Sequence, residues 1–128
     1  MVKLAANLSM MFNEFEFLDR FSKASESGFK GVEYLFPYDY GKDHLLNLLG
    51  ENGLVQVLHN LPAGDWDSGE RGIACHPDRV GEFQEGVELA VEYAATLGCP
   101  QVNCLAGILQ GDIAEGEAYK TFVDNLRY

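Results

Sequence analysis

The sequence has few cysteines, few basic residues and no long apolar run. Its 3 cysteines, Cys75, Cys99 and Cys104, occur without CxxC spacing. An odd number of cysteines without this spacing predicts neither a disulfide framework nor a zinc site. Only 9 basic residues stand against 20 acidic ones, and the net charge of -11 disfavours nucleic acid and membrane surfaces as partners. No stretch approaches the roughly 20 apolar residues that a membrane-spanning helix needs.

A signal peptide is also not apparent. The chain begins Met1-Val2-Lys3, and Asn7 interrupts the short apolar stretch that follows. Together with cysteines expected to be reduced thiols, this predicts a cytoplasmic protein. The composition itself is that of a folded domain, because 47% of the 128 residues are hydrophobic and 8 Phe and 6 Tyr are present.

A repeated unit runs along the chain: a short β-type run, a polar or aromatic loop, and a helix closed by glycine. The predicted strands are 3–8, 31–36, 54–60 and 101–106. Asn13 is the predicted cap of the first helix, and Pro77 opens the third, whose apolar stripe covers 80–97. Gly28, Gly53 and Gly98 close the first three helices. This alternation predicts βαβ units and a parallel sheet.

The two faces of the predicted strands differ in polarity. One parity is largely apolar and is expected to face helices: Leu4, Ala6, Leu8, Val32, Tyr34, Phe36, Val55, Val57, Val102, Cys104 and Ala106. The other parity carries a polar residue on every strand: Lys3, Asn7, Glu33, Gln56, Asn60, Gln101 and Asn103. A doubly wound sheet would bury both faces under helices, whereas the interior of a barrel accepts polar side chains near its mouth.

We therefore predict an α/β fold of parallel β/α repeats, (β/α)4, forming the first half of a TIM (β/α)8 barrel. A whole barrel takes about 250 residues, and this chain is half as long. The expected domain is a single half-barrel spanning 1–128. The last apolar helical stripe, which contains Tyr119, Phe122, Val123 and Leu126, runs to Tyr128 without a closing glycine or proline.

Several stretches together resemble the hydroxypyruvate isomerase family. They are 6–10 (ANLSM), 31–40 (GVEYLFPYDY), 59–66 (HNLPAGDW), 69–75 (GERGIAC) and 125–128 (NLRY). The resemblance covers essentially the whole chain. It implies the xylose-isomerase-like TIM barrel fold and the interconversion of hydroxypyruvate and tartronate semialdehyde. A related member type isomerises 2-oxo-tetronates, which are one carbon longer.

The same resemblance implies that the reaction's catalytic groups are not in this sequence. The family's two catalytic glutamates and its metal ligands lie on later strands, so no catalytic residue and no metal ligand is assigned here. The resemblance implies a divalent metal of the Mg²⁺ or Mn²⁺ type in the complete barrel, and none bound by this chain alone. What the chain would keep is the first-half wall of the active site.

Several polar residues of the strands are candidates to contact a substrate. Glu33 is the carboxylate placed inside a predicted strand, where it contacts substrate or forms an ion pair with Lys3. Asn7 and Asn60 sit at strand ends with the interior parity, and Asn103 shares that parity. These amides suit the recognition of hydroxyl or carbonyl groups, and the alternative is local hydrogen bonding within loops.

Two further candidates lie at the end of the third strand and on the loop after it. His59 is expected to contact the pocket or to bond local backbone. Arg71 is the candidate to bind a substrate carboxylate, because a guanidinium pairs with a carboxylate through two hydrogen bonds. Its alternative is a surface ion pair with Glu70 or Asp67, and nearby Trp66 is placed to exclude water.

No other motif in the sequence indicates chemistry of its own. Asp65 and Asp67 are interpreted as solvated loop residues rather than a metal pair, and the adjacent Cys75 and His76 lack ligand spacing. Two hypotheses remain open. One is an isomerase of a small hydroxy-keto acid that requires a missing C-terminal half. The other is a catalytically inert half-barrel that self-associates.

Overall fold

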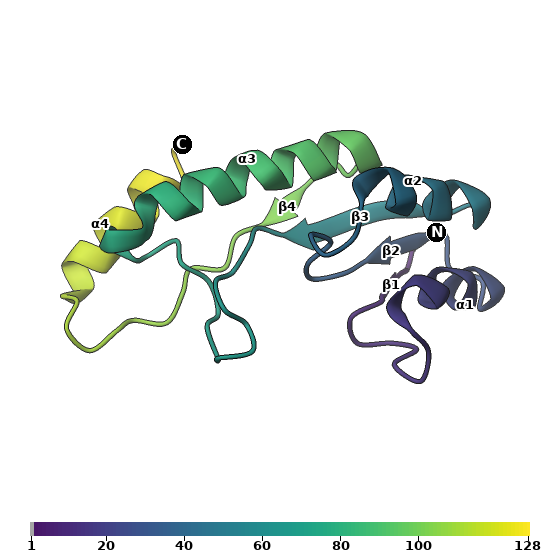
Figure 1. Cartoon of the computed structure of the whole chain (residues 1–128), viewed down its shortest axis with the longest axis horizontal. Helices are drawn as coiled ribbons and strands as arrows, with labels where there is room; N and C mark the ends of the chain where they lie inside the picture. Colours follow the sequence, from purple (N-terminus) through teal and green to yellow (C-terminus); the bar gives the residue numbers. More distant parts are fainter. Residues whose placement is uncertain (1) are drawn as a thin grey trace. The chain divides into compact units, whose positions relative to one another are not determined.

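The structure, a computed structural model, describes residues 2–128 as a four-stranded sheet with helices between the strands (Figure 1). The strands are β1 (Ala5–Asn7), β2 (Gly31–Glu33), β3 (Val55–Asn60) and β4 (Val102–Asn103). Their order in the sheet is β1-β2-β3-β4, and β2 pairs in parallel with both β1 and β3. Each new strand is added on the same side, as in a barrel, whereas a doubly wound sheet reverses direction at a switch point.

The helices follow the predicted alternation. They are η1 (Phe17–Asp19), α1 (Arg20–Glu26), α2 (Lys42–Glu51), η2 (Pro77–Arg79), α3 (Val80–Leu97) and α4 (Glu115–Asn125). Gly28, Gly53 and Gly98 have φ values of 90°, 61° and 64° after α1, α2 and α3. A side chain disfavours this left-handed conformation, so the prediction that these glycines close helices is confirmed.

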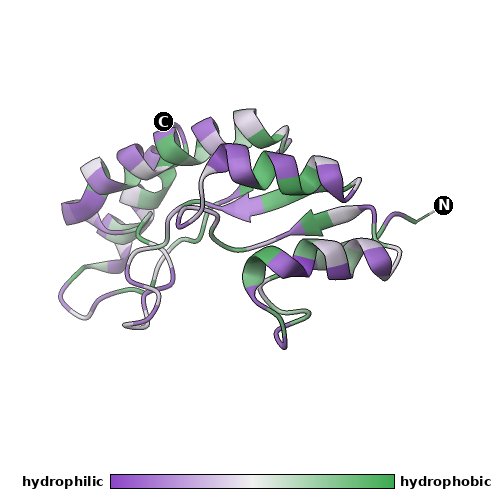
Figure 2. Ribbon diagram, turned by 45° about the vertical axis from the view of Figure 1, so that its right-hand side comes forward, coloured by the Kyte–Doolittle hydropathy of each residue, from purple (hydrophilic) through white to green (hydrophobic). Residues whose placement is uncertain are grey.

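The chain divides into two compact units, one formed by the residues up to His59 with Glu92–Val102 and the other by Asn60–Val91 with Asn103–Tyr128. The first unit has a continuous apolar core built from strand and helix residues. It contains Ala6, Leu8, Phe21, Ala24, Val32, Tyr34, Leu45, Leu49, Leu54 and Leu97. The ring of Phe17 packs edge-on against Phe21 and Tyr34 and stacks on Tyr40. Figure 2 shows hydrophobic and hydrophilic residues mixed along the helices.

An irregularity in β3 changes which side chains of that strand are buried. Val32 pairs with Gln56, but the next residue, Glu33, pairs with Leu58. The extra residue, Val57, has its Cγ1 atom 3.3 Å from the position of a Cβ on Gly31. Such a bulge opposes two residues to one and breaks the alternation of faces.

This bulge corrects one prediction of strand parity. Gln56 was expected to face the barrel interior, yet it is buried on the same side as Val32 and bonds Tyr34. Val55 was expected to face helices, yet its side chain is 62% exposed. Beyond the bulge the predicted parity agrees with the pairing, because Leu58 lies opposite Glu33.

The second unit is organised around a long loop that is held largely by its own main chain. The amide of Gly72 donates to the carbonyl of Ala63 at 2.9 Å, and that of Cys75 donates to Ala106 at 2.8 Å. Gly72 and Ala106 also form an isolated antiparallel bridge. The side chain of Asn125 on α4 donates to the carbonyl of Ala74 at 2.8 Å. The segment between β3 and η2 is therefore an ordered loop with its own hydrogen bonds.

One further detail differs from the sequence-based predictions. Asn13 does not cap the first helix, because its side chain donates to the carbonyl of Met10 and helical structure begins at Phe17. Along the apolar stripe of the last helix, Tyr119 and Leu126 are exposed and Phe122 and Val123 are half-buried, whereas Ala118 and Asn125 are the buried residues of α4. Among the described residues, no helix combines the length and the apolar character needed to cross a bilayer.

Candidate functional site

Asn7 and Glu33, at the ends of the neighbouring strands β1 and β2, are joined by their side chains. The Nδ2 atom of Asn7 donates to Oε1 of Glu33 at 2.9 Å, and Oδ1 of Asn7 accepts the amide of Ser9 at 3.0 Å. Within residues 2–128 no ion pair forms between Glu33 and Lys3. The polar face predicted for these two strands therefore brings an amide and a carboxylate together at the carboxyl edge of the sheet, where ligands of parallel α/β proteins bind.

His59 is fully buried in the first unit and belongs to a chain of three polar side chains. The hydroxyl of Tyr34 bonds Oε1 of Gln56, and Nε2 of Gln56 lies 2.9 Å from Nδ1 of His59. Burial raises the pKa of Tyr34, so its hydroxyl stays protonated and donates to Gln56. The amide nitrogen of Gln56 must then donate, and Nδ1 of His59 accepts. The neutral ring therefore carries its proton on Nε2.

Aromatic rings border this histidine. The ring of Tyr38 lies edge-on to His59 with centroids 6.2 Å apart, and 5.3 Å from the ring of Tyr93. The hydroxyl of Tyr93 donates to the carbonyl of Tyr40 at 2.7 Å. Burial raises the pKa of Tyr38, so its hydroxyl is neutral at physiological pH. The rings of Tyr38 and Tyr93 thus give His59 aromatic surroundings on this side.

The amides of Asn60 and Asn103 meet in the second unit, at the ends of β3 and β4. Nδ2 of Asn103 donates to Oδ1 of Asn60 at 3.0 Å. The main-chain carbonyl of Asn103 accepts the amide of Leu61 at 2.9 Å. Asn60 is buried, whereas Asn103 is exposed. The exposed amide of Asn103 is thus held in place by its hydrogen bond to the buried Asn60.

Arg71 is exposed and is held by its own loop. Its Nη1 atom donates to the carbonyl oxygens of Trp66 at 3.0 Å and Glu70 at 2.7 Å. The guanidinium carbon lies 3.9 Å from the centre of the Trp66 ring, a cation–π arrangement. Among the described residues Arg71 has no carboxylate partner, so the alternative of an ion pair with Glu70 or Asp67 is not what the structure contains. An oriented guanidinium without a counter-charge is suited to an external anion.

Glu70 instead pairs with an arginine at the start of the next helix. Nη1 of Arg79 lies 2.5 Å from Oε1 of Glu70, and Nη2 lies 2.8 Å from Oε1 of Glu82. The second oxygen of Glu70 accepts the amide of Asp65. The hydrogen bonds from Arg79 hold the pKa of both Glu70 and Glu82 below the ordinary glutamate range.

Asp65 is used within the same loop. Its carboxylate accepts the amide and the hydroxyl of Ser68 at 3.0 and 2.7 Å, and these bonds lower its pKa. Within residues 2–128 no cluster of three or more His, Cys, Asp or Glu side chains could hold a metal ion. Asp65 therefore closes a turn with Ser68.

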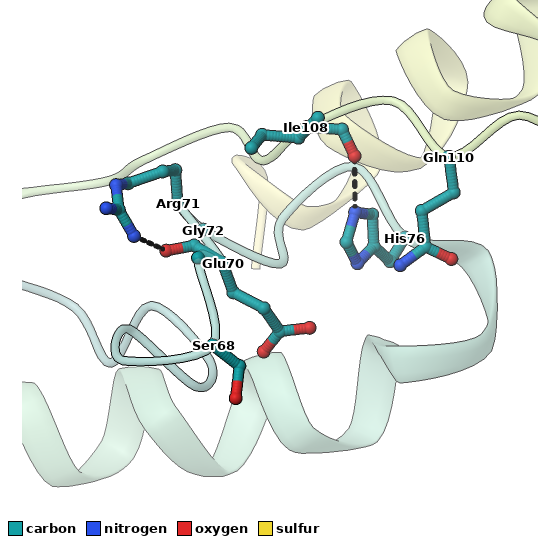
Figure 3. Close-up of a pocket in the computed structure, with 8 residues that line it drawn as sticks. Ser68, Glu70, Arg71, Gly72, His76, Ile108 and Gln110 are labelled. Atoms are coloured by element: carbon teal, nitrogen blue, oxygen red, sulfur yellow. Dashed lines mark hydrogen bonds between the residues drawn. The ribbon is translucent and has the colours of Figure 1, made fainter.

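Together with Ile108 and Gln110, the loop lines an open cavity of about 200 Å³ (Figure 3). Its lining residues are Ser68, Gly69, Glu70, Arg71, Gly72, His76, Ile108 and Gln110. Of these, only Arg71 was a candidate from the sequence. Sequence reasoning also missed Gln56, since a bulge placed it beside His59. No local pattern distinguishes His76 from an ordinary loop histidine, because its position beside Ile108 depends on tertiary structure.

Comparisons with known proteins agree on one superfamily. The family model described as xylose isomerase-like TIM barrel matches residues 21–128. The chain is 51% identical to hydroxypyruvate isomerase of Escherichia coli K12 over 128 residues, which is 100% of this chain and 50% of that protein. It is 46% identical over the same length to 2-oxo-tetronate isomerase of Haemophilus influenzae, again covering 50% of the relative.

A solved structure shows the same architecture. The crystal structure of an AP endonuclease, family 2, from Brucella melitensis matches with a TM-score of 0.95 and 46% identity, over 99% of this chain and 49% of that chain. The chain thus spans about half the length of the curated relatives it matches. The predicted architecture, a (β/α)4 sheet matching the first half of a TIM barrel, is confirmed.

Proposed function

The chain belongs to the xylose isomerase-like TIM barrel family, and from that membership we propose that it forms part of a cytoplasmic isomerase of short hydroxy-keto acids. The proposed reaction interconverts hydroxypyruvate and tartronate semialdehyde. The observation that carries this proposal is the 51% identity to a hydroxypyruvate isomerase along all 128 residues. A 2-oxo-tetronate is the alternative substrate, supported by the 46% identity to an enzyme of that name.

The proposed chemistry moves protons between two adjacent carbons. A base removes the proton from the carbon that bears the hydroxyl group, and the electron pair forms an ene-diolate with the neighbouring carbonyl carbon. A proton then adds to that neighbouring carbon, while the hydroxyl proton passes from one oxygen to the other. Substrate and product are isomers, so no oxidant or reductant is consumed. The resemblance assigns the base to glutamates that have no counterpart among these residues.

The contribution of this chain is proposed to be substrate binding. Arg71 binds the substrate carboxylate, because its guanidinium is oriented by Trp66 and has no carboxylate partner among the described residues. His59, held by Gln56 at its Nδ1 atom, is a further proposed contact. Asn7 with Glu33, and Asn60 with Asn103, supply amides and a carboxylate for hydroxyl and carbonyl groups.

A divalent metal is implied by the resemblance, but the described residues do not provide three metal-binding side chains in one place. We therefore derive no step of the reaction from a metal bound to this chain. Three of the six proposed contacts are amides, which bind neutral oxygen groups through hydrogen bonds without a metal.

The structural neighbour named an AP endonuclease raises a second function, cleavage of nucleic acid. The charge of this chain argues against it, because a net charge of -11 repels a phosphate backbone. Only 9 Lys and Arg stand against 20 Asp and Glu in the whole sequence. The isomerase remains the proposal that the observations favour.

The test combines this chain with the second half of the E. coli relative, by mixing or by fusion. We expect the chain alone to show no measurable turnover of hydroxypyruvate, because its acid–base groups are absent, and the completed barrel to convert it. Loss of one such group typically costs about 10²–10⁴-fold in rate. Turnover by the chain alone would contradict the assignment of the base, and a folded hybrid that acts on neither substrate would contradict the proposed function.

A further inference from the structure

One buried histidine nitrogen in the second unit has no hydrogen-bond partner. His76 is 3% exposed, and its Nε2 atom lies 2.9 Å from the carbonyl oxygen of Ile108. A carbonyl oxygen only accepts, so the ring proton is on Nε2, and Nδ1 of the neutral ring is an acceptor. Among the described residues nothing donates to Nδ1. Leaving a buried acceptor unpaired costs about 1–3 kcal/mol.

This unpartnered nitrogen belongs to the wall of the cavity described above. His76 lines that space together with Glu70, Ser68 and Gln110. In Figure 3 the ring nitrogen remote from Ile108 faces the side where Gln110 and the end of the Glu70 side chain lie. The cavity of about 200 Å³ has room for a molecule of a few carbon atoms, since one water occupies about 30 Å³ of liquid.

Besides the amide of Gln110 and the guanidinium of Arg71, the lining offers acceptors at Glu70 and Ser68. Glu70 remains ionised because Arg79 lowers its pKa. The hydroxyl of Ser68 donates its hydrogen bond to Asp65, so the lone pairs of the Ser68 oxygen remain available as acceptors. The cationic group of Arg71 points away from the His76 ring in Figure 3. A ligand at this wall must therefore bring its own donor, and the carboxylate of Glu70 disfavours an anionic group beside it.

We propose that this cavity binds the hydroxyl end of a short hydroxylated carboxylic acid, with Nδ1 of His76 accepting the hydroxyl proton. The proposal rests on the substrate class proposed above and adds the residue that recognises its hydroxyl. The acid's own carboxylate lies away from Glu70. A neutral hydroxyl can supply the donor that Nδ1 of His76 lacks among the described residues.

The test uses the whole chain labelled with ¹⁵N and observes its 3 histidine rings by two-bond ¹H–¹⁵N correlation. Unliganded His76 should show the Nε2–H tautomer. Glycerate should then shift the Nδ1 resonance of His76 in a saturable way, whereas propionate, which lacks hydroxyl groups, should not. Neither acid can be isomerised, so binding is measured separately from the reaction.

Two variants and one control sharpen the result. His76→Gln keeps a donor near the Ile108 carbonyl but displaces the acceptor, and should weaken glycerate binding about tenfold, the value of one ordinary hydrogen bond. Ser68→Ala, on the exposed loop, removes a neighbouring acceptor and should weaken binding to a smaller extent. His44→Gln, on the exposed surface of α2, should leave binding unchanged.

Several outcomes would overturn the proposal. They are an Nδ1–H tautomer of His76, equal shifts with propionate, shifts caused by methylammonium but not by glycerate, or no saturable shift, which would mean that water alone fills the cavity. If His76→Gln does not fold, titrations of the unaltered chain and of Ser68→Ala with glycerate and propionate still test the proposal. Glycerate binding without turnover in the completed barrel would contradict the isomerase function and leave this site standing.

Discussion

The amide nitrogen of Gln56 lies 2.9 Å from Nδ1 of His59, three positions further along the same strand. In a regular strand, residues three apart face opposite sides of the sheet. The bulge at Val57 brings Gln56 and His59 to the same side, where Tyr34 completes the chain of hydrogen bonds. A single inserted residue therefore fixes the tautomer of the buried histidine.

Replacing Gln56 by methionine should destabilise the fold markedly. The variant leaves the hydroxyl of Tyr34 and Nδ1 of His59 buried without this partner, which costs about 2 kcal/mol or more. Urea denaturation measures the loss. The matched control is Gln101→Met, which removes an exposed hydrogen bond to the carbonyl of Val57 and should cost less than about 1 kcal/mol. Equal losses in the two variants would contradict the role of the buried network.

Gly72 should tolerate no side chain. Its φ is 110°, and a Cβ atom would lie within 2.2 Å of the carbonyl oxygen of Leu105. Gly72→Ala should therefore cost more than about 2 kcal/mol, from strain and overlap together. Gly28→Ala is the control, because Gly28 has a φ of 90° but open space around it, and strain alone costs about 1 kcal/mol. Similar thermal unfolding of the two variants would show that the close contact has no energetic effect.

The sequence predicts the repeat of strand, loop and helix well, because that repeat depends on local signals. Apolar periodicity and the closing glycines at Gly28, Gly53 and Gly98 identify the elements without tertiary information. The position of Gln56 could not be predicted, since alternation of faces assumes that no residue is inserted. Asn13 was misassigned because the same side chain can bond a turn carbonyl as readily as cap a helix.

The residues of the candidate site likewise fall into those that the strand pattern predicts and those that depend on tertiary contacts. Strand parity is a local property, so the sequence could predict the polar residues at the strand ends: Asn7, Glu33, Asn60 and Asn103. Two pairs among them are hydrogen-bonded. The unpaired nitrogen of His76 and the pairing of Glu70 with Arg79 depend on where distant segments meet. Composition and spacing contain no signal for such contacts.

The ion pairs of Arg79 should make stability depend on pH in the acidic range. Because Arg79 lowers the pKa of Glu70 and Glu82 in the folded state, their contribution is fully present above the ordinary glutamate pKa of 4.5. It is lost as the pH falls through the lowered values. Glu70→Gln should cost on the order of 1 kcal/mol at neutral pH.

The measurement is urea denaturation from neutral pH down to about pH 3. The difference between the unaltered chain and Glu70→Gln should shrink over the acidic part of this range. Glu14→Gln, at an exposed position outside the ion pairs of the described residues, is the control and should show no such convergence. A constant difference across the range would show that Glu70 acts through packing rather than charge.

In the completed barrel, Arg71→Ala should raise KM for a keto-acid substrate about ten- to a hundredfold, which corresponds to loss of one charge-assisted contact of about 1.5–3 kcal/mol. Arg71→Lys keeps the charge and should recover part of the affinity, since a lysine cannot form the paired hydrogen bonds. Steady-state kinetics on hydroxypyruvate measure both variants. Unchanged KM in Arg71→Ala would limit Arg71 to ordering its own loop.

The chain on its own should self-associate. Val55 and Leu126 are apolar and more than half exposed. The edge strands of the sheet are β1 and β4, and within residues 2–128 no further strand pairs with their outer edges. Repulsion from the acidic surface is screened within about 8–10 Å at ordinary salt. Sedimentation at micromolar concentration should detect a dimer or larger species, and a monomer that unfolds cooperatively would contradict this prediction.

Main-chain hydrogen bonds set the conformation of the loop around the cavity. Gly72, Cys75 and Ala106 are joined through backbone atoms, and these bonds do not depend on which side chains the neighbouring positions carry. Ser68, Arg71 and Gln110 are exposed, and Ser68 and Arg71 add side-chain bonds to Asp65 and Trp66 within the loop. Replacements at these exposed positions would change the lining of the pocket while the main-chain bonds of Gly72, Cys75 and Ala106 remain, so a library at these positions can be drawn on one backbone.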